Sequence, residues 1–182
     1  FLIKFDLTFI SQSVVDGLIP SSANGAKYYL NLYDAGSEGL PRTHELYAYP
    51  VSQSWSVGQG TFHDDPQTTE GCSWRFRTGE TTADQWVSGS NNTGGTWFSG
   101  SGYEASQSFT HEPADLRMDV TDITWKWLSS TIPNEGFMLK RSGSIGNASS
   151  LVEEGNTTKY GHFSFFGRDT HTIYQPKLEV VW

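Results

Sequence analysis

The sequence predicts an all-β protein, an antiparallel β-sandwich of jelly-roll type with long loops and one short helix. Three observations support this fold class: short segments of alternating apolar and polar residues, many turn-forming residues with 19 Gly and 7 Pro, and an aromatic content of 14% within a total apolar content of 36%. Alternation with a period of two indicates half-buried strands, and many short strands between turns are typical of sandwiches. A chain of 182 residues can bury one core, so we expect a single domain over residues 1–182.

Six segments are expected to form strands. In the first, residues 1–7, every odd-numbered residue is apolar, whereas Lys4 and Asp6 point to the other face. The second, residues 26–33, repeats the pattern and places Tyr28, Leu30 and Leu32 inward. The remaining expected strands are 45–51, 137–140, 162–166 and 177–182, the last with alternating Leu178, Val180 and Trp182.

Residues 119–128 are the one segment with a helical pattern. Val120, Ile123 and Trp127 fall on one face at helical spacing. Asp119 stands where a capping residue satisfies the first free N–H groups of a helix. The region from residue 52 to residue 113 is expected to be mostly loop, either functional or covering the sheet with its own aromatic residues.

Charge and hydropathy exclude two classes of partner. The formal net charge is −8, and the 12 Lys and Arg residues are scattered along the chain. Because nucleic-acid binding needs a clustered basic face, no nucleic-acid partner is expected. No apolar run approaches the roughly 20 residues that cross a bilayer, so membrane insertion is not expected either.

Several segments occur together in an order that resembles a known family. They are FLIKFDLT, AKYYLNLY, PVSQSW with GCSWRFR, DVT followed by WL, NEGFMLK and the closing FFGRDTHTIYQPKLEVVW. This order resembles the DNRLRE-type domain, a jelly-roll-like β-sandwich of surface proteins. The segment SQSWSVGQGTFHDDPQTTEGCSWRFR is most similar to the version in structural proteins of marine tailed phages.

The resemblance implies structural roles for six residues and no chemistry. Trp55, Trp74 and Trp127 stand at motif positions and are expected in the core, Asp119 caps the helix, and Arg168 and Asp169 form a turn pair beside the last strand. It also implies an extracellular or virion-surface location. Domains of this family usually carry a strand before the FLIKFDLT-like one. The chain is therefore expected to be a fragment of a longer protein, to lack that strand, or to receive it from a partner.

The stretch from Ser54 to Trp74 offers three apparent sites. Gly58-Gln59-Gly60 is predicted to be a turn rather than a phosphate loop, because the Pro66 that follows argues against the helix that such a loop needs. Cys72 is predicted to be a small buried residue that shares a strand face with Trp74, since no base is evident for a nucleophile.

Asp64 and Asp65 are the one candidate metal site. With His63 they supply part of the oxygen shell that calcium requires, and the glycine loop beside them could add backbone carbonyls. The alternative is that they are solvated loop charges. Calcium is thus the only cofactor that the sequence leaves open.

Three aromatic residues in loops rich in Gly, Ser and Asn are candidates for binding. Trp86, Trp97 and Tyr103 either contact glycans through exposed ring faces or pack over the sheet or against a subunit. These residues favour a carbohydrate-binding or adhesion module that recognises cell-surface glycans as the alternative function.

The leading expectation is a non-catalytic structural module of an extracellular assembly. Its most specific form is a phage virion component: a capsid decoration, fibre or tail protein whose partners are other copies or other proteins of the assembly. A hydrolase acting on surface polysaccharide is a third hypothesis. We do not expect an enzyme, because the spacing of the acidic residues in the loop region selects no catalytic pair.

Overall fold

The computed structural model describes residues 1–22, 24–40, 43–59, 70–87, 94–110, 115–141 and 161–182, and every structural statement refers to these residues. Strands dominate, with two short α-helices and one 3-10 helix. The elements are β1 (Leu2–Ile3), α1 (Thr8–Val15), β2 (Lys27–Leu32), β3 (His44–Pro50), the 3-10 helix (Thr82–Asp84), β4 (Ala105–Phe109), β5 (Leu116–Asp119), α2 (Thr121–Leu128), β6 (Phe137–Lys140) and β7 (Lys177–Val181).

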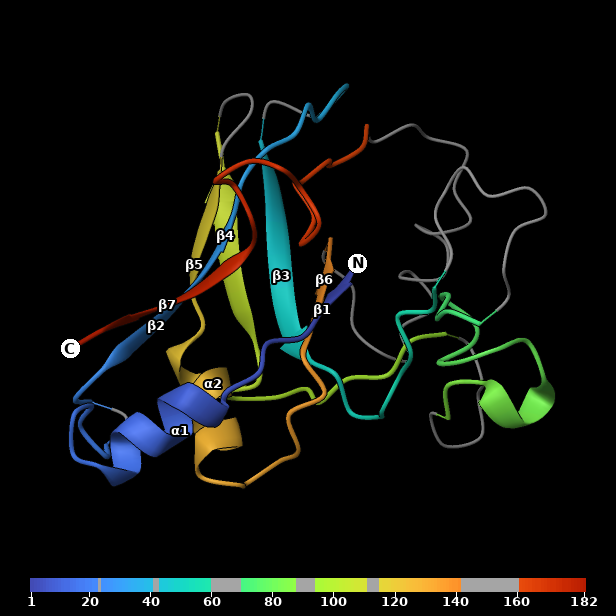
Figure 1. Cartoon of the computed structure of the whole chain (residues 1–182). Helices are drawn as coiled ribbons and strands as arrows, with labels where there is room; N and C mark the ends of the chain where they lie inside the picture. Colours follow the sequence, from blue (N-terminus) through green and yellow to red (C-terminus); the bar gives the residue numbers. More distant parts are fainter. Residues whose placement is uncertain (23, 41–42, 60–69, 88–93, 111–114, 142–160) are drawn as a thin grey trace.

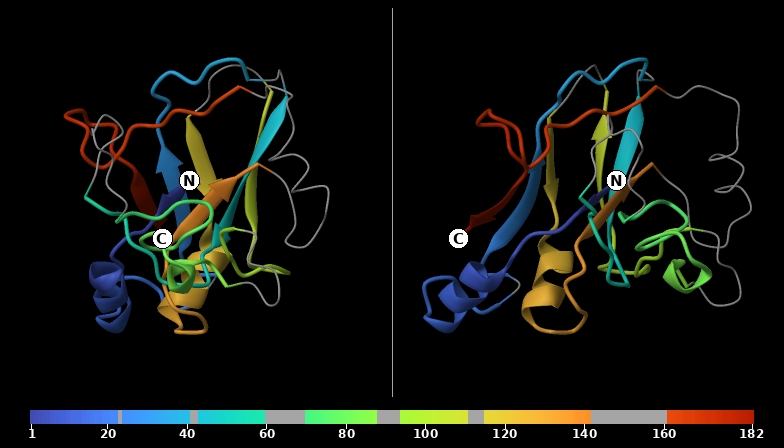
Figure 2. Two further views of the ribbon diagram at one scale, coloured as in Figure 1. Left: turned by 90° about the vertical axis from the view of Figure 1, so that its right-hand side faces the viewer. Right: turned by 45° about the vertical axis from the view of Figure 1, so that its right-hand side comes forward.

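The strands form two antiparallel sheets (Figure 1). One has the order β1-β6-β3-β4 and the other the order β5-β2-β7. Both α-helices lie at the same end of the two sheets (Figure 2). No helix within the described ranges is long and apolar enough to cross a membrane.

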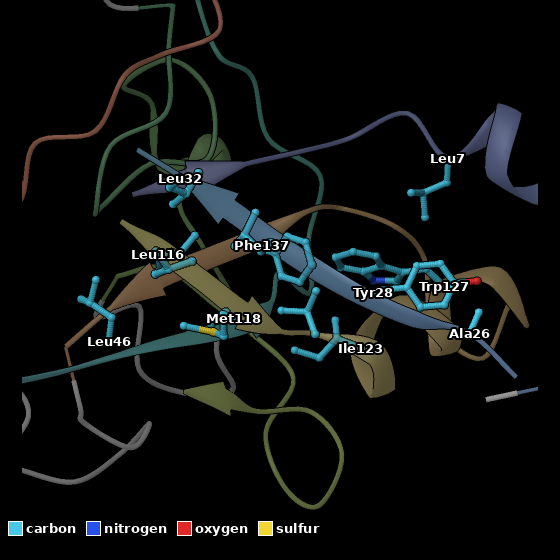
Figure 3. Packing of buried hydrophobic residues seen from close by; sticks show 14 of the residues in the cluster. Leu7, Ala26, Tyr28, Leu32, Leu46, Leu116, Met118, Ile123, Trp127 and Phe137 are labelled. Carbon is cyan, nitrogen blue, oxygen red and sulfur yellow. The ribbon is translucent and has the colours of Figure 1, made fainter. Parts of the chain in front are cut away.

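One hydrophobic core joins the two sheets. Tyr28, Leu30 and Leu32 of β2 are completely buried, which confirms the inward face predicted for this strand. The same core contains Leu46 of β3 and Phe137 of β6, so the inner faces of both sheets contribute to it (Figure 3). This arrangement is compatible with a β-sandwich.

The four-stranded sheet is also covered on its outer face. Along β3, Ala48 belongs to the core between the sheets, whereas the next residue, Tyr49, belongs to a second cluster. The buried members of this second cluster are Tyr49, Val51, Trp86, Trp97 and Met138. Strands buried on both faces are continuously apolar, which fits the Phe137-Met138-Leu139 run of β6. The region after β3 thus supplies tryptophans that cover the sheet.

The Asp119-Val120-Thr121 motif ties the start of α2 to β2. The backbone N–H of Tyr28 donates to Thr121 Oγ1 at 3.0 Å, and the N–H of Val120 donates to the Tyr28 carbonyl at 2.9 Å. Asp119 Oδ1 accepts from the N–H of Thr121 at 3.0 Å. Burial acts to raise the pKa of Asp119, but the Thr121 hydrogen bonds and the charge of Lys27 outweigh it, so the pKa is lowered.

Replacing Thr121 by valine is expected to lower the free energy of unfolding by about 1–3 kcal/mol. The change keeps the shape but leaves the buried N–H of Tyr28 without its acceptor. Urea denaturation measures the loss, and hydrogen exchange at the Tyr28 amide should become faster. Thr121→Ser is the control, because it keeps the hydroxyl group. Equal amide protection in both variants would contradict the assigned hydrogen bond.

Two predictions about the N-terminal segment were wrong. The expected strand over residues 1–7 ends at Ile3, and residues 8–15 form a second α-helix where only one helix was expected. The cause is local: Asp6 Oδ1 accepts hydrogen bonds from the Thr8 N–H at 2.9 Å and from Thr8 Oγ1 at 2.6 Å. A carboxylate that bonds the backbone two residues ahead turns the chain out of the extended conformation.

Other strand predictions were corrected in part. Residues 162–166 make only isolated bridges, His162 with Glu38 and Phe165 with Asp34, rather than a strand. The strands β4 and β5 were not predicted. The strand expected over residues 177–182 is β7, but Trp182 is exposed rather than inward. By contrast, β3, β6 and α2 confirm the predicted segments within two residues.

Candidate functional site: an aromatic cleft

A cleft of about 580 Å³ lies where the tryptophan-bearing segments meet β1 and β6. We call it the aromatic cleft. Its lining includes Trp55, Trp74, Trp86, Met138, Lys140 and Arg141. Figures 1 and 2 show the segment 70–87, in green, beside the four-stranded sheet on the side of β1 and β6. The volume of the aromatic cleft lies within the range of about 300–1,000 Å³ that is usual for ligand sites.

Backbone hydrogen bonds hold the two loop segments of the cleft together. The N–H of Ser56 donates to the Arg77 carbonyl at 3.0 Å, and the N–H of Cys72 donates to the Ser56 carbonyl at 2.8 Å. Gly58 has a φ of 75°, and a side chain there would lie 2.7 Å from the Cα of Gly71. Glycine therefore permits both the turn and the close approach. Gly60, the other glycine of the predicted turn, lies outside the described residues.

Trp74 was predicted in the core, but 43% of its surface is exposed. It lies in no strand and lines the cleft. A side chain at Gly94 would overlap the Trp74 indole, so the bare backbone of Gly94 lies directly against the ring. The Trp97 ring centroid is 6.4 Å from that of Trp74. The exposed indole is therefore supported from within the protein.

Two of the three glycan-contact candidates, Trp86 and Trp97, are buried. Trp86 is only 1% exposed, and its Nε1 donates to the Ser73 carbonyl at 2.9 Å. Trp97 is also buried, with its ring 5.7 Å from that of Tyr49. Both rings follow the packing alternative, in which the loop region covers the sheet. Because a buried face cannot stack on a sugar, these two positions do not carry the glycan hypothesis.

The third glycan candidate, Tyr103, is half-buried at another place. Its ring stacks on Phe98 with centroids 5.9 Å apart, and Lys126 Nζ lies 4.8 Å from its centroid. Trp55, predicted in the core, is likewise half-buried, and its Nε1 donates to the Glu135 carbonyl at 2.7 Å. The structure therefore groups Trp55 with Trp74 and Trp86, not with Tyr103.

Two cations mark one side of the cleft. Lys140 Nζ lies 4.2 Å from the Trp97 ring centroid and 5.9 Å from that of Trp74. Arg141 donates a hydrogen bond to the Gly161 carbonyl at 3.0 Å. Among the described residues that line the cleft, these two are the charged side chains, and both are positive. The cleft thus combines an indole surface with positive charge.

Cys72 lines the cleft as a free, half-buried thiol. It lies in no strand, and its exposure differs from the fully buried position that was predicted, because its segment forms the wall of the cleft rather than part of the core. Burial raises the pKa of the thiol. A raised pKa leaves less of the nucleophilic thiolate at neutral pH.

Alkylation of Cys72 by iodoacetamide is expected to be slower in the folded protein than in the urea-unfolded chain at neutral pH. The rate should rise with pH along a curve whose midpoint lies above the value of about 8.5 for a free thiol. Mass spectrometry of the alkylated protein measures both rates. A folded rate equal to or above the unfolded rate would contradict the raised pKa.

The predicted calcium ligands Asp64 and Asp65 lie outside the described residues, so calcium stays a prediction. Within the described part of the chain, no group of three or more His, Cys, Asp or Glu side chains is placed to hold a metal ion. A smaller polar pocket of about 160 Å³ lies at the start of α2, between Lys27, Glu104 and Asp122.

The other residues singled out from the sequence lie in the core, at the start of α2 or in a turn, away from the cleft. Trp127 is buried as predicted, with its ring centroid 4.5 Å from that of Phe137. Asp119 accepts a hydrogen bond from Thr121, the first residue of α2, but the N-cap position is Val120 and not Asp119 as predicted. Arg168 and Asp169 form an exposed turn pair with 3.2 Å between Arg168 Nε and Asp169 Oδ1.

The cleft residues that sequence reasoning did not single out include Val57, Met138, Lys140 and Arg141. One signal could have found three of them. The run Phe137-Met138-Leu139 indicates a strand with two apolar faces, and two cations follow it directly. A second layer of side chains must then bury the other face of such a strand. The two cations at the end of the strand would lie at the edge of that layer.

The fold and the cleft define a β-rich protein of two antiparallel sheets with an aromatic cleft beside β1 and β6. No family model, curated protein or solved structure matches the chain.

Proposed function

We propose that the chain is a non-catalytic structural module of an extracellular assembly, with a phage virion component as its specific form. The observation that carries the proposal is the outer edge of β7. In the order of described strands, β7 is the last of its sheet and pairs with β2 on one side. An open strand edge presents backbone donors and acceptors that another chain can pair with.

Exposed apolar side chains flank this edge. Ile173 and Tyr174 precede β7, and Val181 and Trp182 stand at its far end, all of them exposed. Figure 1 shows β7 on the outer side of its sheet. Large exposed apolar surfaces on a folded domain mark contacts with other proteins. The partners that fit are other copies of the chain or other proteins of the same assembly.

The DNRLRE-type membership and the jelly-roll topology belong to this proposal. Support comes from the order of the quoted sequence segments and from the two antiparallel sheets. The structure also explains two of these segments: Thr121 of the DVT segment binds β2, and Phe137 of the NEGFMLK segment fills the core. An experimental structure that traces all connections between the strands would test the topology.

The assembly role is tested by sedimentation of the purified chain over a range of concentrations. We expect concentration-dependent association, which Val181→Lys should abolish because a charge on an edge strand opposes pairing. Phe9→Lys is the matched control, since Phe9 is an exposed apolar residue of α1 and not of the strand edge. A monomer at all concentrations, together with absence of the protein from purified virions, would contradict the proposal.

The absence of catalysis is tested directly. We expect no release of reducing ends when the chain is incubated with surface polysaccharides. Release that persists after exhaustive purification would instead favour the hydrolase hypothesis.

A further inference from the structure

We propose that the aromatic cleft binds acidic saccharide units of a polysaccharide, with the sugar ring on Trp74 and its acidic group beside Lys140 and Arg141. The inference is independent of the assembly role, because the cleft borders β1 and β6 whereas the proposed assembly edge is β7 of the other sheet.

The first argument is the state of Trp74. The residue is 43% exposed and lines the cleft, although Gly94 supports its ring from within the protein. A side chain that is held in place loses little conformational freedom when a ligand binds, so a supported ring is a favourable binding surface. The apolar face of a sugar ring stacks on such an indole.

The second argument is the bottom of the cleft. Trp86 and Met138 are buried beneath it and belong to the second hydrophobic cluster. Trp86 is fixed by its hydrogen bond to Ser73, and Trp55 by its hydrogen bond to Glu135. Mostly apolar walls with a few polar groups are the usual composition of a preformed ligand site.

The third argument is charge, and it selects the ligand. The whole chain carries a net charge of −8. Nevertheless, the charged side chains among the described residues of the cleft are Lys140 and Arg141, which are both cationic. Cations at the border of an apolar cleft attract an anionic group more strongly than a neutral or cationic one. A carboxylated sugar presents both the apolar ring face and the anion.

Binding is tested with tetragalacturonate as the acidic saccharide and cellotetraose as the neutral saccharide of the same length. We expect tetragalacturonate to change the tryptophan fluorescence, to slow the alkylation of Cys72 and to bind more weakly as salt is added. Cellotetraose should bind at least about tenfold more weakly, and polyglutamate, which has the charge without the ring, should not protect Cys72.

Variants locate the binding. Trp74→Ala should weaken tetragalacturonate binding at least about tenfold, and Lys140→Gln should remove most of the preference for the acidic over the neutral saccharide. Phe9→Ala is the matched control, because it removes an exposed aromatic ring that does not line the cleft and should leave binding unchanged. Circular dichroism checks the fold of each variant. Should Trp74→Ala unfold, Lys140→Gln and the Cys72 protection of the unaltered protein decide the question.

Several outcomes would overturn the inference. These are no binding of tetragalacturonate, equal binding of cellotetraose, protection of Cys72 by polyglutamate, or unchanged affinity in a folded Trp74→Ala variant. None of them bears on the association of the chain through β7, so the two proposals fail separately.

Discussion

Replacing Phe137 with alanine is expected to lower the free energy of unfolding by about 3–5 kcal/mol. Phe137 is completely buried and belongs to the core that both sheets share. Removing a buried phenyl ring loses its transfer free energy and leaves a cavity that the sheets cannot close. The ring also loses its edge contact with Trp127, whose centroid is 4.5 Å away. Figure 3 shows Phe137, Trp127 and Tyr28 close together in this core.

Such a loss is a large part of the 5–15 kcal/mol that stabilises a typical domain. Urea denaturation followed by tryptophan fluorescence measures it, with the slope of the transition as a check on two-state behaviour. Phe9→Ala is the control, because Phe9 is 82% exposed and its removal should change the stability by less than about 0.5 kcal/mol. Similar losses in both variants would show that Phe137 is not at the centre of the core.

The parts of the fold that the sequence predicts well are those where apolar spacing alone decides burial. Tyr28, Leu30 and Leu32 alternate through β2 and are completely buried. Likewise, Ile123 and Trp127 face the core from α2 at helical spacing. In both elements one face is apolar and the other polar, so one period describes the segment.

The strand β4 shows where this reasoning ends. Its sequence is Ala-Ser-Gln-Ser-Phe, and only Phe109 has a large apolar side chain. Its place is determined by pairing with β3 and not by its own pattern. The tendency of such a segment to form a strand depends on neighbouring strands, which the local sequence does not contain. For the N-terminal strand the limit is different, because two hydrogen bonds between Asp6 and Thr8 override seven residues of alternation.

The candidate site shows the same limit for tryptophans. Trp86 stands in a polar, loop-like sequence and is buried, whereas Trp74 lies near Cys72 in an expected strand and is exposed. The difference comes from the outer face of the four-stranded sheet, where Tyr49 and Met138 require cover. Contacts between segments far apart in the chain decide which tryptophan is buried against this face and which lies at its exposed edge. The resemblance to a DNRLRE-type domain implied a core position for Trp74, and this expectation was wrong.

Replacing Gly136 with alanine is expected to lower the free energy of unfolding by roughly 2–5 kcal/mol. Gly136 has a φ of 85°, in the left-handed region that costs other residues about 1–2 kcal/mol. A side chain there would also overlap the carbonyl oxygen of Ile3 and lie 2.9 Å from Cβ of Lys4. Overpacking of this kind typically costs a further 1–3 kcal/mol or so.

The position of Gly136 explains why the structure cannot relax around a new side chain. Its carbonyl accepts from the N–H of Val51 at 2.9 Å, and it immediately precedes β6, which pairs with both β1 and β3. A shift at Gly136 would therefore disturb the pairing of Ile3 with Phe137 and move one wall of the aromatic cleft. Thermal and urea denaturation measure the loss of stability, and the fluorescence of the cleft tryptophans reports the movement of the wall.

Gly167→Ala is the matched control for this prediction. Gly167 is an exposed glycine without a left-handed φ, and a side chain there would meet nothing within 4 Å. Alanine at Gly167 should leave the stability unchanged or raise it by up to about 1 kcal/mol, since it restricts the unfolded chain. Equal stability of the two variants would contradict the close contact between β1 and the start of β6. It would also contradict the position of β1 in the wall of the cleft. A loss confined to Gly136→Ala would instead show that this approach stabilises both the sheet edge and the cleft.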